Sequence, residues 1–342
     1  MKTFTREQGA VGLVANFGYN GGEVVQNDFN SKYPWNSITK LYDEKTGNYW
    51  VRIPKFYTKY TLDDDGYITE RYVSQYRVDK TWHLNPVFID KHGKDLPFVE
   101  VAAYQLSIDA LTNLAKSVPN VMAVGGTRTA EALRSIVEIY EDINDGYDYE
   151  LYNIWADIML QDLYLIEFAK IEKSTTKYNS IMYGNRGTRV NNGQTDGLSD
   201  ENASGVVSAK TNTSCSSPMR YRYIENIFGN GYHFIDGITV SDDVITIKDN
   251  TGTKVSSIKA PVQSGFVHKL TFDSETKLVY PAVLAERGKA AYGDNYSHNG
   301  GTKMLFKGWS SQDYNSMFNY NLMTNTNSNT NITCRMIRYT QR

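Results

Sequence analysis

The chain has 342 residues, a net charge of −2 and a pI near 6.2, so its charge does not favour nucleic acid or an anionic membrane as a partner. It contains 26 tyrosines, and its mean hydropathy of −0.49 predicts that many aromatic side chains are half exposed with their hydroxyls hydrogen-bonded. No apolar run approaches the ~20 residues of a membrane span, and the N-terminus lacks the apolar core of a signal peptide. We expect a protein that is made in a cytoplasm, without a membrane span, and whose surface is suited to contact.

The first third of the chain carries strand patterns. Residues 1–32 are rich in Gly and Asn and are expected to form an N-terminal arm or connector. Aromatic and β-branched residues alternate with charged ones in Tyr49–Tyr60, which predicts a strand with one wet face. Tyr67–Val78 resumes this character after Asp63–Gly66. The aspartates of that segment lack the alternating ligands and terminal glutamate of a calcium loop, so we predict a hairpin turn there. A further strand is expected at Phe98–Tyr104.

Two helical patterns occupy the middle of the chain. Thr129–Tyr140 starts at a capping threonine and places its apolar residues on one face. Trp155–Lys170 carries a broad apolar arc, which predicts a helix that is buried on most sides.

Strand patterns return in the second half of the chain. A strand is predicted at Tyr232–Asp236, a β-hairpin at Val244–Ile258 within an insertion near 240–275, and a strand at Lys277–Ala285. No repeat and no clean linker divides the sequence. The pattern therefore predicts one α+β domain over residues 33–342, with many short strands and two main helices.

The C-terminal stretch 307–342 has the composition of a binding surface. Asn, Ser and Tyr supply adaptable hydrogen bonds and rigid amphipathic area, which recognition loops favour, although a polar tail has a similar composition. The apolar finish from Cys334 to Tyr339 indicates a strand that returns to a core, which a disordered tail would not need. Seven asparagines fall within seventeen residues here: Asn315, Asn319, Asn321, Asn325, Asn327, Asn329 and Asn331.

The residues offer little catalytic machinery. Asp142 with Asp145, and Asp242 with Asp243, could in principle form a carboxylate pair, but turn or solvated positions account for them. No nucleophile elbow, phosphate-binding loop or dinucleotide motif occurs. We therefore predict a protein that is not an enzyme and has no cofactor.

The sequence also lacks a metal motif. Cys215 and Cys334 match no ligand spacing and form either one disulfide or, as we favour, two buried thiols. An ion in the loop Asn191–Asp200 is left open. The five histidines are scattered and predict no metal site: His83, His92, His233, His268 and His298.

Seven short motifs follow one another over residues 33–342: YWVRIPKFYTKY, WHLNPVF, FVEVAAYQLS, NIWADIMLQDLYLIEFAK, RYRYIENIFGNGYHFIDGI, GWSSQDYNSMFNYN and CRMIRY. In order and spacing they resemble the C-type-lectin fold of formylglycine-generating-enzyme-like domains, especially phage tail-fibre and ligand-binding proteins that are diversified by retroelements. In that family a Gly-Asn-aromatic turn comes before a Trp- or Phe-containing strand, and a Gly-Ser-Trp region and a short Arg-containing final strand follow. Gly229-Asn230, Phe234, Gly308-Trp309 and Arg335 occupy those places here.

The resemblance implies that diversified side chains near the C-terminus line a binding face on a fixed scaffold. The implied scaffold residues are Phe318, Leu322, Ile332, Met336 and Ile337. The implied ligand-binding residues are Trp309, Ser311, Gln312, Tyr314, Asn315, Asn319, Tyr320, Asn321, Asn325, Asn327 and Asn329.

The resemblance also implies a function. We expect a non-enzymatic receptor-binding protein at the tip of a phage or prophage tail fibre, in the virion, recognising a bacterial surface protein or glycan. It would act as a homo-oligomer, with a trimer as one form, and would contact other tail proteins. The alternatives are a structural tail or baseplate protein and a catalytic relative of the formylglycine-generating enzymes. The reactive cysteine pair of those enzymes has no counterpart in Cys215 and Cys334.

Overall fold

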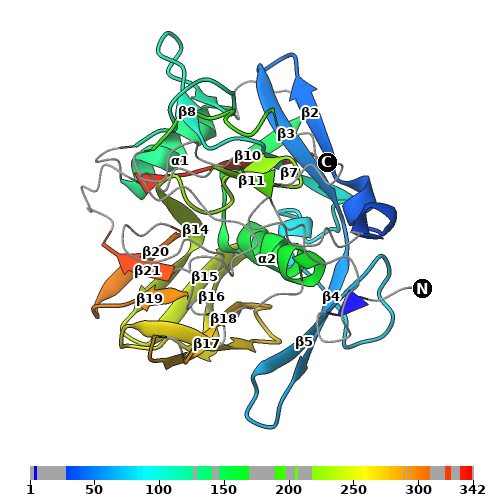
Figure 1. The fold of residues 1–342 in the computed structure, drawn as a ribbon, viewed down its shortest axis with the longest axis vertical. Helices are drawn as coiled ribbons and strands as arrows, with labels where there is room; N and C mark the ends of the chain where they lie inside the picture. Colours follow the sequence, from blue (N-terminus) through cyan, green and yellow to red (C-terminus); the bar gives the residue numbers. More distant parts are fainter. Residues whose placement is uncertain are drawn as a thin grey trace, which may run out of the picture.

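The computed structural model describes residues 4–5, 28–125, 129–140, 146–168, 189–197, 205–206, 218–287, 289–290, 292, 294–308, 320–324 and 332–340. Within these ranges the chain forms two α-helices and many strands, so the predicted α+β class is confirmed at this level. Figure 1 shows helix α2 in the middle of the molecule, with strands around it. No helix in the described ranges is long and apolar enough to cross a membrane.

Helix α2 (Ile154–Phe168) is the centre of the core. Every side chain from 154 to 167 is buried, as the broad apolar arc predicts. The helix also carries buried polar residues, and each has a partner on another element or on the helix itself. The Asp162 carboxylate pairs with the Arg71 guanidinium, and the Glu167 carboxylate pairs with that of Arg222. These pairs join the helix to distant parts of the chain.

Helix α1 (Ala130–Glu138) begins where the sequence predicts. The Thr129 hydroxyl accepts a hydrogen bond from the Ala132 N–H at 3.2 Å, which caps the first turn. The buried face carries Leu133, Ile136 and Val137, and the helix packs against strand β10 (Tyr147–Leu151).

A five-stranded sheet lies beside α1. Strand β23 (Met336–Thr340) comes latest in the sequence but lies inside the sheet, because it pairs with β10 on one side and with β7 on the other. The Arg338 guanidinium on β23 pairs with the carboxylates of Glu100 and Asp43. The predicted strand at the C-terminal apolar finish is thus confirmed. In spatial order the strands are β10 (Tyr147–Leu151), β23 (Met336–Thr340), β7 (Phe98–Ala102), β3 (Asn48–Pro54) and β2 (Thr39–Asp43).

A nine-stranded sheet forms the other large layer. The predicted hairpin at 244–258 is confirmed as β15 and β16, and the predicted strand at Tyr232–Asp236 extends to Ser241 as β14. Its strands are β16 (Gly252–Lys259), β15 (Val244–Asp249), β14 (Tyr232–Ser241), β20 (Thr302–Lys307), β21 (Tyr320–Met323), β19 (Asn295–Ser297), β17 (Gly265–Phe272) and β18 (Val279–Ala285), with β22 (Ile332–Thr333) pairing β14.

The strand predicted over Tyr49–Tyr60 is two strands in two sheets. The chain leaves the five-stranded sheet after Pro54, and the fully buried Phe56 packs edge to face on Phe88 at the change of direction. The next strand joins a four-stranded sheet, in which the predicted turn at Asp63–Gly66 is confirmed. That sheet contains β1 (Phe4–Thr5), β5 (Ile68–Ser74), β4 (Tyr57–Leu62) and β6 (His83–Leu84).

Short elements complete the described fold. Phe29 lies within the predicted arm, but its side chain is fully buried against Trp35, so this part of the arm belongs to the core. The short elements are 3₁₀ turns at Asp28–Ser31, Trp35–Ser37 and Pro86–Phe88, and strands β8 (Ser107–Ile108), β9 (Ala115–Lys116), β11 (Gly205–Val206), β12 (Met219–Tyr221) and β13 (Ile224–Glu225).

Candidate functional site

The predicted binding residues fall mostly in two segments, 309–319 and 325–331, that lie outside the described residues. Tyr320 and Asn321 are described, and both belong to strand β21. The other predicted binding residues lie outside the description: Trp309, Ser311, Gln312, Tyr314, Asn315, Asn319, Asn325, Asn327 and Asn329.

The prediction that the Tyr320 side chain is displayed to a ligand is wrong. Its side chain is fully buried, and its ring stacks on that of Tyr280 with centroids 5.7 Å apart. Its hydroxyl accepts a hydrogen bond from the Gln161 side-chain amide at 2.8 Å. Burial also raises the pKa of the Tyr320 hydroxyl. Tyr320 is therefore part of the scaffold, because its partners lie on α2 and β18 and hold it inward.

Asn321 lies in the middle of the sheet rather than on a loop. It stands opposite Phe306 of β20 and Ser297 of β19, and its side chain is half-buried. The expected scaffold residues on either side behave as predicted, since Leu322, Ile332 and Met336 are buried, as is Ile337. Phe318 lies outside the described residues.

The two undescribed segments start and finish on strands of the nine-stranded sheet. Lys307, near the end of β20, is paired with Tyr320 at the start of β21, so the segment 309–319 joins two neighbouring strand ends. The segment 325–331 joins β21 to β22, where Ile332 is paired with Tyr232 of β14. Their flanking residues therefore have fixed positions in one sheet.

A buried ion pair fixes the first of these ends. The Lys307 ammonium pairs with the Asp157 carboxylate on α2, and both side chains are at most 1% exposed. Burial lowers the pKa of Lys307, while Asp157 raises it. The same carboxylate accepts hydrogen bonds from Gln161 at 2.6 Å and from the Tyr152 hydroxyl at 3.2 Å. The central helix and the end of β20 are thus joined by one polar network, which also reaches Tyr320 through Gln161.

Two glycines of the motifs that carry the resemblance, Gly229 and Gly308, are in contact. The Gly229 N–H donates to the Gly308 carbonyl at 2.7 Å. Gly308 has a φ of +83°, and a Cβ there would lie 2.9 Å from the Phe228 Cβ, so the approach requires glycine. The Arg335 guanidinium is buried and donates to backbone carbonyls, among them Ala102 at 2.5 Å.

A second polar cluster supports the turn at Gly229-Asn230. The Gln105 amide donates to the Thr333 hydroxyl at 3.1 Å and contacts His233 Nε2 at 2.9 Å. Its carbonyl accepts from the Asn230 amide at 2.7 Å. Burial and the nearby Arg335 charge lower the pKa of His233 to about 3, so the imidazole is neutral at physiological pH. This histidine is a structural group.

Metal and catalytic candidates do not come together within the described ranges. No group of three or more His, Cys, Asp or Glu side chains there could hold a metal ion. In the loop at 191–197, the Glu225 carboxylate accepts from the N–H groups of Gly193 and Thr195 at 2.8 Å each, so this loop is organised by a carboxylate.

Of the remaining cysteine and carboxylate candidates, some lie within the described residues and some lie outside them. Cys334 is fully buried, whereas Cys215 and the pair Asp142 and Asp145 lie outside the described residues. Asp242 and Asp243 occupy the predicted turn. There the Asp242 carboxylate accepts from the Gly301 N–H at 3.0 Å, and that of Asp243 pairs with Lys259 at 3.3 Å.

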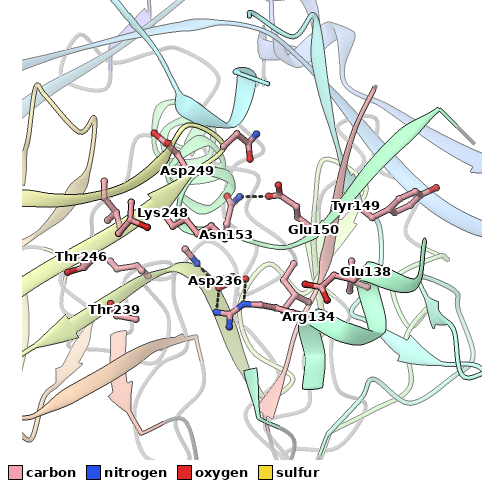
Figure 2. Close-up of a pocket in the computed structure, with 17 residues that line it drawn as sticks. Arg134, Glu138, Tyr149, Glu150, Asn153, Asp236, Thr239, Thr246, Lys248 and Asp249 are labelled. Atoms are coloured by element: carbon pink, nitrogen blue, oxygen red, sulfur yellow. Dashed lines mark hydrogen bonds and ion pairs between the residues drawn. The ribbon is translucent and has the colours of Figure 1, made fainter. Parts of the chain in front are cut away.

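A cleft of about 510 Å³ lies between α1, β10, β14 and β15. Figure 2 shows side chains from α1 and β10 facing those from β14 and β15 across it. The Arg134 guanidinium forms two hydrogen bonds with the Asp236 carboxylate, at 2.5 and 2.8 Å. Gly237 follows with a φ of +74°, and a Cβ there would lie 2.9 Å from the Lys248 carbonyl oxygen. The register of β14 against β20 shifts over this stretch, so the bulge shapes the cleft wall.

Glu150 lies on another wall of this cleft. Its Oε2 accepts from the Asn153 amide at 3.3 Å and from the Tyr339 hydroxyl at 3.1 Å. Burial, with a smaller contribution from the Asp236 charge, raises the pKa of Glu150 to about 7. A carboxyl group in a cleft with such a pKa is a candidate functional group. The sequence did not indicate it, because Glu150 belongs to an ordinary YDYEL strand and its neighbours come from far along the chain.

Comparison of the sequence with known proteins gives no match, either to a protein-family model or to a curated protein. The function therefore rests on the residues and their geometry.

Proposed function

We propose that this chain is a non-enzymatic binding protein that recognises a bacterial surface protein or glycan through the segments 309–319 and 325–331. In this proposal it is displayed on a phage or prophage tail fibre, and retroelement diversification generates the Asn/Ser/Tyr-rich surface. The fold would be of the C-type-lectin type, as the motif resemblance implies. Tyr320 and Asn321 are left out of the proposed contact set because both lie in β21.

The observation that carries the proposal is the anchoring of both segments. Each is bounded by strands of the nine-stranded sheet, and the bounding residues Lys307, Tyr320 and Ile332 are buried. A buried ion pair and the Gln161 hydrogen bond tie two of them to α2. Side chains between such anchors can change without loss of the core, which suits a variable recognition surface.

The chemistry of the segments suits polar ligands. Asn amides both donate and accept hydrogen bonds, and Tyr and Trp rings stack on apolar faces of sugars or side chains. Contacts of this kind are individually weak, so adhesion would depend on several copies acting together.

The test is adhesion of fluorescently labelled protein to a panel of gut-type and soil-type bacteria. In the loss variant, which is designed to abolish binding, the residues within 309–319 are scrambled, and so are those within 325–331. Residues 320–324 stay unchanged because strand β21 belongs to the core. We expect the unaltered protein to bind a few strains and the loss variant to bind none, with both equally stable to heat.

A matched control changes an exposed residue elsewhere. Leu111 is 96% exposed and distant in sequence from both segments, so Leu111→Ser should bind as the unaltered protein does. Binding by the loss variant, in which both segments are scrambled, would contradict the proposal. Absence of binding by every protein, with the fold intact, would favour a structural role and direct the search to a partner in the virion.

A further inference from the structure

The cleft beside Glu150 has both polar and apolar side chains in its lining. Four buried apolar side chains contribute to its lining: Val137, Leu151, Ile238 and Ile247. A smaller cavity of about 120 Å³ shares Tyr149, Glu150 and Asn250 with the cleft. Glu150 therefore lines both cavities, and the residue is half-buried.

The hydrogen-bond partners of Glu150 are neutral. Both hydrogen bonds reach one oxygen, Oε2, and come from an amide and a phenol. The charge of Lys248, which also lines the cleft, acts on Glu150 without an ion-pair contact. Among the residues that the structure describes, no Lys, Arg or His lies within 4 Å of its carboxylate oxygens, whereas the buried carboxylates of Asp157, Asp162 and Glu167 each pair with a cation. Ionised Glu150 therefore lacks the contacting cation that these three carboxylates have.

The charges around the cleft leave a negative excess. The two cations in its lining, Arg134 and Lys248, face four carboxylates. Arg134 is held by Asp236, and Asp249 is paired with Lys254 from outside the lining at 3.0 Å. The carboxylates that line the cleft are Glu138, Glu150, Asp236 and Asp249.

We propose that this cleft binds a cationic side chain of the lysine type, with the ammonium group on the Glu150 carboxylate and the aliphatic stem along the apolar part of the lining. An ammonium group supplies the missing counter-charge and can donate to Oε1 while Asn153 and Tyr339 hold Oε2. The stem matches Val137, Leu151, Ile238 and Ile247. The residues that carry this proposal differ from those of the segments 309–319 and 325–331, so it stands or falls independently of the function proposed above.

The test uses a lysine derivative as the probe. Nα-acetyl-lysine N-methylamide is titrated into the full chain by calorimetry, beside the same compound acetylated at Nε, which has the stem without the charge. We expect the charged probe to bind with millimolar affinity. The acetylated probe should bind at least about tenfold more weakly. Equal binding of the two probes, or no binding of the charged probe, would overturn the proposal.

Two variants locate the binding. Glu150→Gln keeps the shape and the acceptor oxygen but removes the charge, so it should lose about tenfold in affinity or more. Asp243→Asn removes one negative charge from an exposed turn outside the cleft, so it should bind the probe as the unaltered protein does. An affinity that is equal in Glu150→Gln and the unaltered protein would place the probe elsewhere.

A pH series distinguishes Glu150 from other carboxylates. Since its pKa is about 7, the affinity should rise about tenfold between about pH 6 and about pH 8, and it should not rise in Glu150→Gln. His92 lines the neighbouring cavity, and any contribution from it would persist in Glu150→Gln. A pH effect of equal size in both proteins would remove Glu150 from the site. The charged or titratable groups around Glu150 are Asp90, Lys91, His92, Arg134, Glu138, Asp148, Tyr149, Asp236, Lys248, Asp249 and Tyr339.

A direct measurement covers the case in which Glu150→Gln is unstable. The side-chain carboxyl carbon of Glu150 can be followed by NMR in isotopically labelled protein as the pH changes. The charged probe should lower the pKa of Glu150, because the bound ammonium favours the ionised carboxyl. An unchanged titration of this signal at saturating probe would contradict the proposal without any substitution.

Discussion

The ion pair between Lys307 and Asp157 is wholly buried, so each charge depends on the other. Lys307→Met leaves the Asp157 carboxylate without its cation in the core, and we expect a loss of about 3–5 kcal/mol in the free energy of unfolding. The double variant Lys307→Met, Asp157→Asn removes both charges and keeps hydrogen-bonding groups for Gln161 and Tyr152. It should be markedly more stable than the single variant in urea unfolding.

An exposed pair serves as the control for that experiment. The Lys289 Nζ and the Glu286 Oε2 lie 2.6 Å apart, but the two side chains are 74% and 78% exposed. Lys289→Met should leave the urea midpoint unchanged, because solvent screens such pairs. If Lys307→Met also left the urea midpoint unchanged, the buried network would not stabilise the end of β20.

Glu150 makes the stability of the fold depend on pH. Because the pKa of Glu150 is about 7 in the folded protein and ordinarily 4.5, the folded state binds its proton more tightly than the unfolded state. The free energy of unfolding should therefore fall as the pH rises from about 4.5 to about 7, by roughly 3 kcal/mol at most, and then level off. Glu150→Gln should lack this fall in urea unfolding curves.

The unaltered protein must be compared with Glu150→Gln because buried histidines change the free energy of unfolding with pH in the opposite direction. Burial lowers the pKa values of His83 and His233 to about 3, so their contribution to stability is lost as the pH falls from about 6.5 towards 3. The difference between the unaltered protein and Glu150→Gln cancels that common effect. A difference that stays constant with pH would contradict the assignment.

At the scale of elements, the close approach of β20 to the Gly229 turn depends on Gly308. Gly308→Ala places a Cβ against Phe228 at positive φ, whereas Gly300→Ala has the same unfavourable φ and nothing within 4 Å. We expect Gly300→Ala to cost about 1 kcal/mol and Gly308→Ala about 1–3 kcal/mol more. Thermal unfolding of the two variants measures the difference. Equal costs would mean that the turn can move aside.

The sequence predicts the elements whose signals are local. Thr129 caps α1, the aspartates at 63–65 form a turn, and the apolar arc at 155–170 forms a buried helix, because neighbouring residues decide each of these. The change of sheet at Phe56 was missed because its partner Phe88 is remote in the chain. Tyr320 was misjudged for the same reason, since Gln161 and Tyr280 determine its burial. The cleft at Glu150 depends on four elements and left no local pattern.

At the scale of the whole molecule, we expect a homo-oligomer, with a trimer as the form that suits a fibre tip. Weak polar contacts become useful adhesion when linked copies bind together. Light scattering coupled to size exclusion should give a mass that is a multiple of 38.8 kDa. A monomer over the whole concentration range would contradict this expectation and would leave adhesion to depend on another protein that clusters the chain.

The interior position of β23 affects how this protein tolerates change. Residues 309–331 are translated before 336–340, yet the five-stranded sheet needs those last residues between β10 and β7. A frameshift or stop codon in residues 309–331 would therefore remove a central strand and leave Glu100 and Asp43 without Arg338. Only in-frame products could close the sheet. If this stretch varies as proposed, folding itself would screen its new versions before any of them met a ligand.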